Sequence, residues 1–305
     1  MPSTTQLKSD DLYTLPVVTF GAPDPARRSV AYTVSWADKE TNCYRGSIRV
    51  VHIADGSTRA YTHGRYRDFA PQWAPSGERL FFLSDRGGSV QIWSIEVNGG
   101  EARAEPKLPG DVAEFALSPD GKYVAAIATP DATKQAIDER GWRRVTSLRY
   151  RADGVGYLDD PACLWLIDLA SGSTRELDGG GFDAAPAWSF DGARLAFAGE
   201  HSPTADMLWH HELWVADAAN GFKPEQVLQM DGALEVPAWS LDGGSIAFIG
   251  LKRDRVGRHD QYASLQHNGR RKRSAMLDAA DRMDGMQRGA HRYRRSREHR
   301  AACLA

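Results

Sequence analysis

The sequence predicts an all-β protein, an incomplete β-propeller followed by a disordered basic C-terminal tail. Three observations predict it: a hairpin pattern recurs through residues 25–251, tryptophans recur at fixed places in that pattern, and the composition changes sharply after residue 251. The repeats are considered first, because self-similarity at a fixed period identifies propellers and solenoids before any single element is assigned.

The recurring hairpin consists of an apolar residue, a polar link, a glycine four residues later and then an apolar strand. Copies begin at Trp73, Leu117, Trp188 and Trp239, and the last three carry Asp-Gly at the turn. Glycine accepts positive φ, so this dipeptide favours tight hairpins. We therefore expect the apolar residue to end one strand and the run after the glycine to form the next.

A third strand, usually with its own tryptophan, and then a short outer strand follow each hairpin. The outer-strand candidates include residues 174–177 and 226–229. A meander of about four strands is the sequence signature of a propeller blade. We expect the tryptophans to form the core between blades; they are Trp73, Trp93, Trp165, Trp188, Trp214 and Trp239.

The spacing of the turn glycines predicts two insertions. Gly77, Gly121, Gly192 and Gly243 are 44, 71 and 51 residues apart, against about 45 residues for a blade. The longer intervals place insertions at residues 128–160 and 200–211. Residues 1–24 then form a lead-in, and residues 25–251 form about four to five blades of an expected seven or eight. A sandwich with Asp-Gly hairpins is the alternative, which the recurrence of the whole pattern disfavours.

Residues 252–305 differ from the rest in charge and composition. From residue 251 onward there are 15 basic and 6 acidic residues, a net charge of +9, which leaves 23 basic and 34 acidic residues and a net charge of −11 before it. No Trp, Phe, Ile or Val follows residue 256, so we expect this tail to form no strand.

Two explanations of the tail stay open. Its charge would attract nucleic acid through phosphate contacts. Alternatively, a frame change near codons 255–265 of a GC-rich gene would produce the excess of arginine. The frame change is favoured, because the composition switches within a blade and no linker separates the two parts.

Other function classes are excluded by simple features. No apolar run approaches the roughly 18 residues of a membrane span, and the first residues lack the basic and apolar regions of a secretory signal. Cys43, Cys163 and Cys303 fit neither a disulfide framework nor a zinc spacing. We therefore expect a cytoplasmic protein with no metal and no cofactor.

One insertion resembles a known family. Residues 147–157, Ser-Leu-Arg-Tyr-Arg-Ala-Asp-Gly-Val-Gly-Tyr, lead into Leu164-Trp-Leu-Ile-Asp168. This stretch resembles the propeller segment of bacterial acylaminoacyl-peptidase and dipeptidyl-peptidase-like members of the prolyl oligopeptidase family of serine peptidases. The blades are also similar to those of the Tol-system periplasmic protein and of WD-repeat-like propellers. The resemblance covers about residues 10–255.

The resemblance implies a propeller that caps a C-terminal α/β-hydrolase domain and filters peptides into a chamber between the two domains. That domain carries a Ser-Asp-His triad, whose serine lies in a Gly-x-Ser-x-Gly turn. This sequence has no such pentapeptide. We therefore expect no catalytic residues in this chain. We expect a substrate-gating propeller that is truncated before the catalytic domain and is inactive alone. It would meet peptides through that missing domain. The alternative is a non-enzymatic, protein-binding scaffold like the Tol-system protein.

Four arginines are the candidate gating residues. Arg143, Arg144, Arg149 and Arg151 lie in or beside the longest insertion, where a guanidinium would hold a peptide carboxylate by two hydrogen bonds. A solvated loop is the alternative explanation.

Two other clusters are assigned structural roles. Neighbouring side chains in a strand point to opposite faces, so His210-His211-Glu212 is not expected to bind a metal. Asp120, Asp191 and Asp242 recur once per turn, which favours a role in the turns over catalysis.

Overall fold

A computed structural model describes residues 8–129, 141–145, 148, 150–152, 156–158, 161–178, 186–201, 210–253, 259–267 and 275–277. Apart from two short 3-10 helices, the regular structure of these residues is β-strand, so the predicted all-β class is confirmed. The described chain divides into two compact units, residues 8–107 and residues 108–277, and each is considered by itself.

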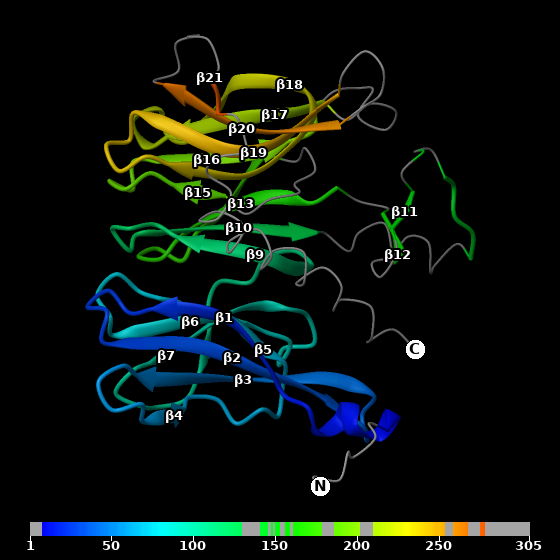
Figure 1. Cartoon of the computed structure of the whole chain (residues 1–305), viewed down its shortest axis with the longest axis vertical. Helices are drawn as coiled ribbons and strands as arrows, with labels where there is room; N and C mark the ends of the chain where they lie inside the picture. The colour runs from blue at the N-terminus through cyan, green and yellow to red at the C-terminus, as the bar shows by residue number, and fades with distance from the viewer. Residues whose placement is uncertain are drawn as a thin grey trace, which may run out of the picture. The chain divides into compact units, whose positions relative to one another are not determined.

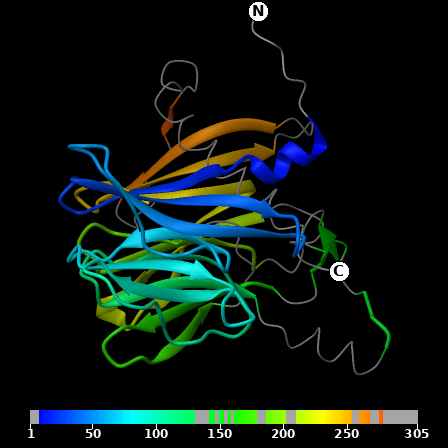
Figure 2. The ribbon, with the colours of Figure 1, turned by 90° about the horizontal axis from the view of Figure 1, so that it is seen from below.

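The first unit contains two antiparallel, four-stranded meanders, blades 1 and 2. Blade 1 follows η1 (Ser9–Thr14) and consists of β1 (Val17–Pro23), β2 (Ser29–Asp38), β3 (Cys43–His52) and β4 (Thr58–Ala60). Blade 2 consists of β5 (Asp68–Trp73), β6 (Arg79–Ser84), β7 (Gln91–Glu96) and β8 (Arg103–Ala104). Figure 2 shows the blue and cyan sheets lying one against the other. Because β1 pairs with β2, blade 1 begins within the stretch expected to be a lead-in.

The second unit contains three further sets of strands. Blade 3 consists of β9 (Asp111–Leu117), β10 (Tyr123–Thr129), β13 (Cys163–Asp168) and β14 (Thr174–Asp178), with the small hairpin β11 (Arg151–Ala152) and β12 (Gly156–Tyr157) between β10 and β13. A seven-stranded sheet follows, whose strands pair in chain order. Its elements are β15 (Ala187–Trp188), β16 (Arg194–Gly199), β17 (His210–Asp217), β18 (Lys223–Trp239), β19 (Ser245–Arg253), β20 (His259–His267) and β21 (Ala275–Leu277), with η2 (Ala218–Asn220) before β18. Figure 1 draws this sheet in colours from green at β15 to orange at β21.

The long strand β18 joins two blades into this one sheet. Its first half pairs with β17 and its second half with β19, and the change falls at Gly232. Gly232 has φ +142°, a conformation that side chains rarely adopt. Blade 4 is therefore β15–β17 with the first half of β18, and blade 5 is the second half with β19–β21.

The last two strands lie within residues 252–305, where the composition predicted none. β20 pairs with β19 along its whole length, from Ser245 opposite His267 to Arg253 opposite His259. A strand ladder is made of backbone N–H and C=O groups, so it does not require the β-branched residues that this stretch lacks. The expectation that the tail forms no strand was therefore wrong for residues 259–267 and 275–277, and the rest of the tail after residue 253 lies outside the described residues.

The predicted hairpin turns are present, with a conformation that the sequence did not specify. In the turn of blade 3, Ser118 Oγ donates to Asp120 Oδ1 at 2.6 Å, and Gly121 N donates to Ser118 O at 2.9 Å. Gly121 has φ +71°, whereas Asp120 is not left-handed. The loop is therefore a tight turn closed by a left-handed glycine, and the aspartate serves the turn, as predicted.

Tryptophans tie neighbouring blades together within each unit. The indole N–H of Trp73 donates to Ala22 O, that of Trp188 to Ala116 O and that of Trp239 to Ala187 O, each at 3.0 Å. Every acceptor lies in the first strand of the preceding blade. All three indoles also pack against buried apolar clusters. The predicted role of these tryptophans between blades is confirmed.

Candidate functional site

The insertion between β10 and β13 carries two of the predicted arginines on one aromatic ring. The guanidinium of Arg143 lies 3.6 Å from the ring centroid of Tyr157, and that of Arg151 lies 5.7 Å from it. The ring of Tyr150 is 6.4 Å from the same ring. Arg144 is exposed nearby in the sequence, and Arg149 lies outside the described residues. The insertion therefore gathers positive charge around Tyr157.

The same insertion presents large apolar side chains to solvent. They are Trp142, Val145, Leu148, Tyr150, Tyr157 and Leu158. A guanidinium stacked on a ring keeps its hydrogen-bonding edge in its own plane, a geometry suited to a carboxylate. An exposed surface that mixes aromatic rings and arginines is typical of binding sites. The arrangement is chemically suited to hold a peptide, not to catalyse a reaction.

A carboxylate–histidine cluster closes the base of the second insertion, where β16 ends. His201 Nε2 lies 2.7 Å from Asp178 Oδ1, and His201 Nδ1 lies 3.4 Å from Glu212 Oε2. Asp178 ends β14 of blade 3, whereas Glu212 belongs to β17 of blade 4. His201 therefore bridges two blades.

The adjacent histidines of β17 face separate partners. His210 Nδ1 lies 2.7 Å from Asp231 Oδ1, at an ion-pair distance but without hydrogen-bond geometry. His211 Nε2 lies 2.6 Å from Glu200 Oε1, and its Nδ1 lies 3.1 Å from both the N and the O of Leu234. Among the described residues, no group of three or more His, Cys, Asp or Glu side chains is arranged to hold a metal.

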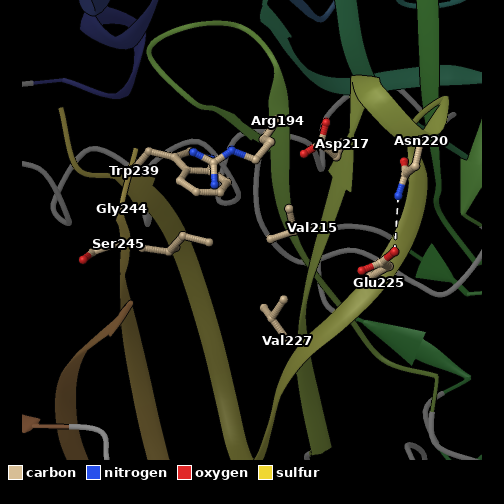
Figure 3. Close-up of a pocket in the computed structure, with 10 residues that line it drawn as sticks. Arg194, Val215, Asp217, Asn220, Glu225, Val227, Trp239, Gly244 and Ser245 are labelled. Carbon is tan, nitrogen blue, oxygen red and sulfur yellow. Dashed lines mark hydrogen bonds between the residues drawn. The ribbon is translucent and has the colours of Figure 1, made fainter. Parts of the chain in front are cut away.

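A groove of about 320 Å³ lies at the turn ends of blades 4 and 5. It is lined by Arg194, Val215, Asp217, Asn220, Glu225, Val227, Trp239, Gly244, Ser245 and Ile246. Figure 3 shows Arg194 over Trp239 on one side and Glu225 with Asn220 on the other, with Val215 and Val227 between them.

Both sides of the groove are held by polar contacts. The Arg194 guanidinium lies 4.5 Å from the Trp239 ring centroid and donates to Gly243 O at 2.7 Å. Asn220 Nδ2 donates to Glu225 Oε1 at 3.3 Å. Sequence analysis missed this groove, because its residues converge from several strands and only the strand register reveals that they share one face.

No helix in the described part of the chain is long and apolar enough to cross a bilayer.

Similar proteins give these features a context. No protein-family model matches the sequence. The chain is 30% identical over 219 residues to the uncharacterized peptidase YuxL of Bacillus subtilis, covering 68% of this chain and 33% of that protein. It is 26% identical over 263 residues to dipeptidyl-peptidase 5 of Porphyromonas gingivalis, covering 79% and 38%. The chain thus spans little more than a third of these relatives.

Solved structures share the fold. Acylaminoacyl peptidase of Pyrococcus horikoshii matches with a TM-score of 0.69 and 14% identity over 92% of this chain and 42% of its own. The β-propeller domain of the trilobed protease of Pyrococcus furiosus matches with a TM-score of 0.59 and 13% identity over 88% and 73%. The propeller fold is confirmed, and the chain is similar in sequence to proteins named as a peptidase and a dipeptidyl-peptidase.

Proposed function

We propose that this chain is the substrate-gating propeller of an acylaminoacyl-peptidase-like serine peptidase that acts on peptides. The observation that carries the proposal is the 30% identity to a peptidase over 219 residues. The sequence has no Gly-x-Ser-x-Gly, so the proposal assigns the nucleophile and its triad to an α/β-hydrolase domain outside these residues.

The insertion of blade 3 supports the gating role. Arg143 and Arg151 share the ring of Tyr157, and Arg144 and Arg149 add charge to the same segment. Guanidinium groups recognise a carboxylate by paired hydrogen bonds, whereas a neutral amide end offers them no charge. We therefore assign to these arginines the recognition of the carboxylate end of a peptide.

Binding of two matched peptides tests this assignment. One probe is a fluorescein-labelled pentapeptide with a free C-terminal carboxylate, and the other is its C-terminal amide. Fluorescence anisotropy should show the wild-type chain binding the carboxylate about three- to tenfold more tightly. The double substitution Arg143→Gln with Arg151→Gln should abolish the difference.

A matched control is available in blade 1, where Arg59 stacks on Tyr61 at 5.1 Å from the ring centroid. Arg59→Gln should leave the preference for the carboxylate intact. Equal affinity of the wild-type chain for both peptides contradicts the gating role. Hydrolysis of an aminoacyl-nitroanilide by the purified chain contradicts the placing of the triad elsewhere.

A further inference from the structure

The groove at the turn ends of blades 4 and 5 has a closed counterpart between blades 3 and 4. There the gap is filled by Phe222, which is 5% exposed. Its ring centroid lies 5.2 Å from that of Tyr123 and 5.8 Å from that of Trp188. The Arg175 guanidinium donates to the carbonyl of Gly221 at 2.8 Å and so holds the turn that carries this ring.

The strand registers show that both gaps have the same walls. Trp165 pairs with Glu176 in blade 3, and Trp214 pairs with Gln226 in blade 4. The apolar cluster that contains Phe222 includes Leu166, Leu177, Trp188 and Leu195. Counting from these pairs, their equivalents one blade later are Val215, Val227, Trp239 and Ile246. All four equivalents line the groove. The groove therefore has the shape of a socket for an aromatic ring.

The rims of the two gaps differ in charge. Arg175 pairs with Leu166, and Glu225 pairs with Val215 at the equivalent place. The Arg175 guanidinium, which donates to the Gly221 carbonyl at the closed gap, is thus replaced at the groove by a hydrogen-bond acceptor, the carboxylate of Glu225. Asp217 adds a second carboxylate to the lining, so two carboxylates and the one guanidinium of Arg194 line the groove. The rim is suited to a cation.

We infer that the groove binds a peptide segment in which an aromatic side chain adjoins a lysine or arginine. The ring occupies the place that Phe222 occupies one blade earlier, and the cation meets Glu225 and Asp217. This inference goes beyond the proposed function. The groove lies at the turn ends of β16 and β17, whereas the insertion with the gating arginines leaves from the opposite end of its own blade.

Fluorine NMR tests the inference. One buried ring and one exposed ion pair should give a weak dissociation constant, on the order of 0.1–1 mM. The probe is acetyl-Gly-(4-fluoro-Phe)-Arg-Gly-amide, which has no carboxylate to engage the gating arginines. Line broadening on titration with the full chain gives its affinity. The same peptide with Glu in place of Arg should bind about three- to tenfold more weakly. Acetyl-Gly-Ala-Arg-Gly-amide should fail to displace the probe.

A charge swap provides the matched variant. Glu225→Arg should reverse the preference, so that the glutamate peptide binds more tightly than the arginine peptide. Arg59→Glu, a charge change in blade 1, should leave both affinities unchanged. The comparison of the two peptides uses the wild-type chain alone, so a variant that fails to fold cannot decide the result. Equal binding of both peptides overturns the inference, and so does an absence of binding at about 5 mM peptide.

Discussion

At the scale of single residues, the repeated aspartates act through hydrogen bonds to their own turns. Asp191 accepts hydrogen bonds from Ser189 Oγ at 2.6 Å and from Ala193 N at 3.0 Å. These bonds, that from Ser189 above all, hold the pKa of Asp191 below its ordinary value. The ionised side chain therefore stabilises the fold above the pKa of the unfolded chain, and this contribution is lost as the pH falls through the folded pKa.

Asp191→Asn should therefore lower the free energy of unfolding at pH 7 by about 0.5 kcal/mol, a small effect because the carboxylate is exposed and screened. The difference from wild type should shrink below about pH 4. Urea unfolding at pH 7 and pH 3.5 measures this difference in the free energy of unfolding. Glu101→Gln is the control, because Glu101 is exposed and is not one of the turn aspartates. A difference that is equal at both pH values would show that charge has no part in it.

At the scale of elements, a blade is held to the next by one indole hydrogen bond as well as by apolar packing. Trp239, at the end of β18, reaches back to Ala187 in β15. Trp239→Phe keeps a ring in the gap but leaves the Ala187 carbonyl without this donor. An unsatisfied carbonyl costs more than the net worth of the hydrogen bond itself.

We expect Trp239→Phe to lower the free energy of unfolding by about 1–3 kcal/mol. Trp142→Phe serves as the control, because Trp142 is 57% exposed in the insertion, and it should change stability by less than about 0.5 kcal/mol. Chemical denaturation measures both. If the two variants unfolded at the same urea concentration as wild type, the indole would have no role in joining blades.

At the scale of the whole molecule, opposite charges are separated along the chain, with −11 before residue 251 and +9 from there on. Contacts with phosphate release counterions, so binding driven by charge alone weakens steeply with salt. We expect gel-shift retention of duplex DNA by the full chain at about 50 mM salt and its loss by about 200 mM. A chain ending at residue 277 keeps +6 of this +9, because residues 278–305 hold 7 basic and 4 acidic residues, so its retention should be weakened but not lost. Retention that survived the higher salt would instead support a genuine nucleic-acid-binding role.

The sequence predicted those structural features in which one residue type has a single local role. Left-handed glycine turns and indole contacts between blades were predictable, because the chemistry of Gly121 recurs in all four copies and that of Trp188 in three of them. Less local features were not predictable. Val236 adopts φ +51° beside a break in the β18–β19 register, although β-branched residues disfavour that conformation. Tertiary pairing imposes it, and no propensity signals it.

The groove shows the same limit. Nothing in the sequence near Glu225 marks it as a rim residue, because its place depends on which residue of β17 it faces. The four arginines predicted to gate substrates were chosen from the insertion alone, and the structure gathers Arg143 and Arg151 on Tyr157, which was not among the predicted site residues.

The uninterrupted course of β18 constrains how this protein can be taken apart. In most repeat proteins a module can be excised or duplicated by cutting at loops, because each module contacts only its neighbours. Here Lys223–Trp239 is one strand whose two halves serve blades 4 and 5. An engineer who wished to delete blade 5, or to permute the termini to this boundary, would have to sever a hydrogen-bonded strand instead of a linker. Blades 4 and 5 can therefore be removed or kept intact only as a pair.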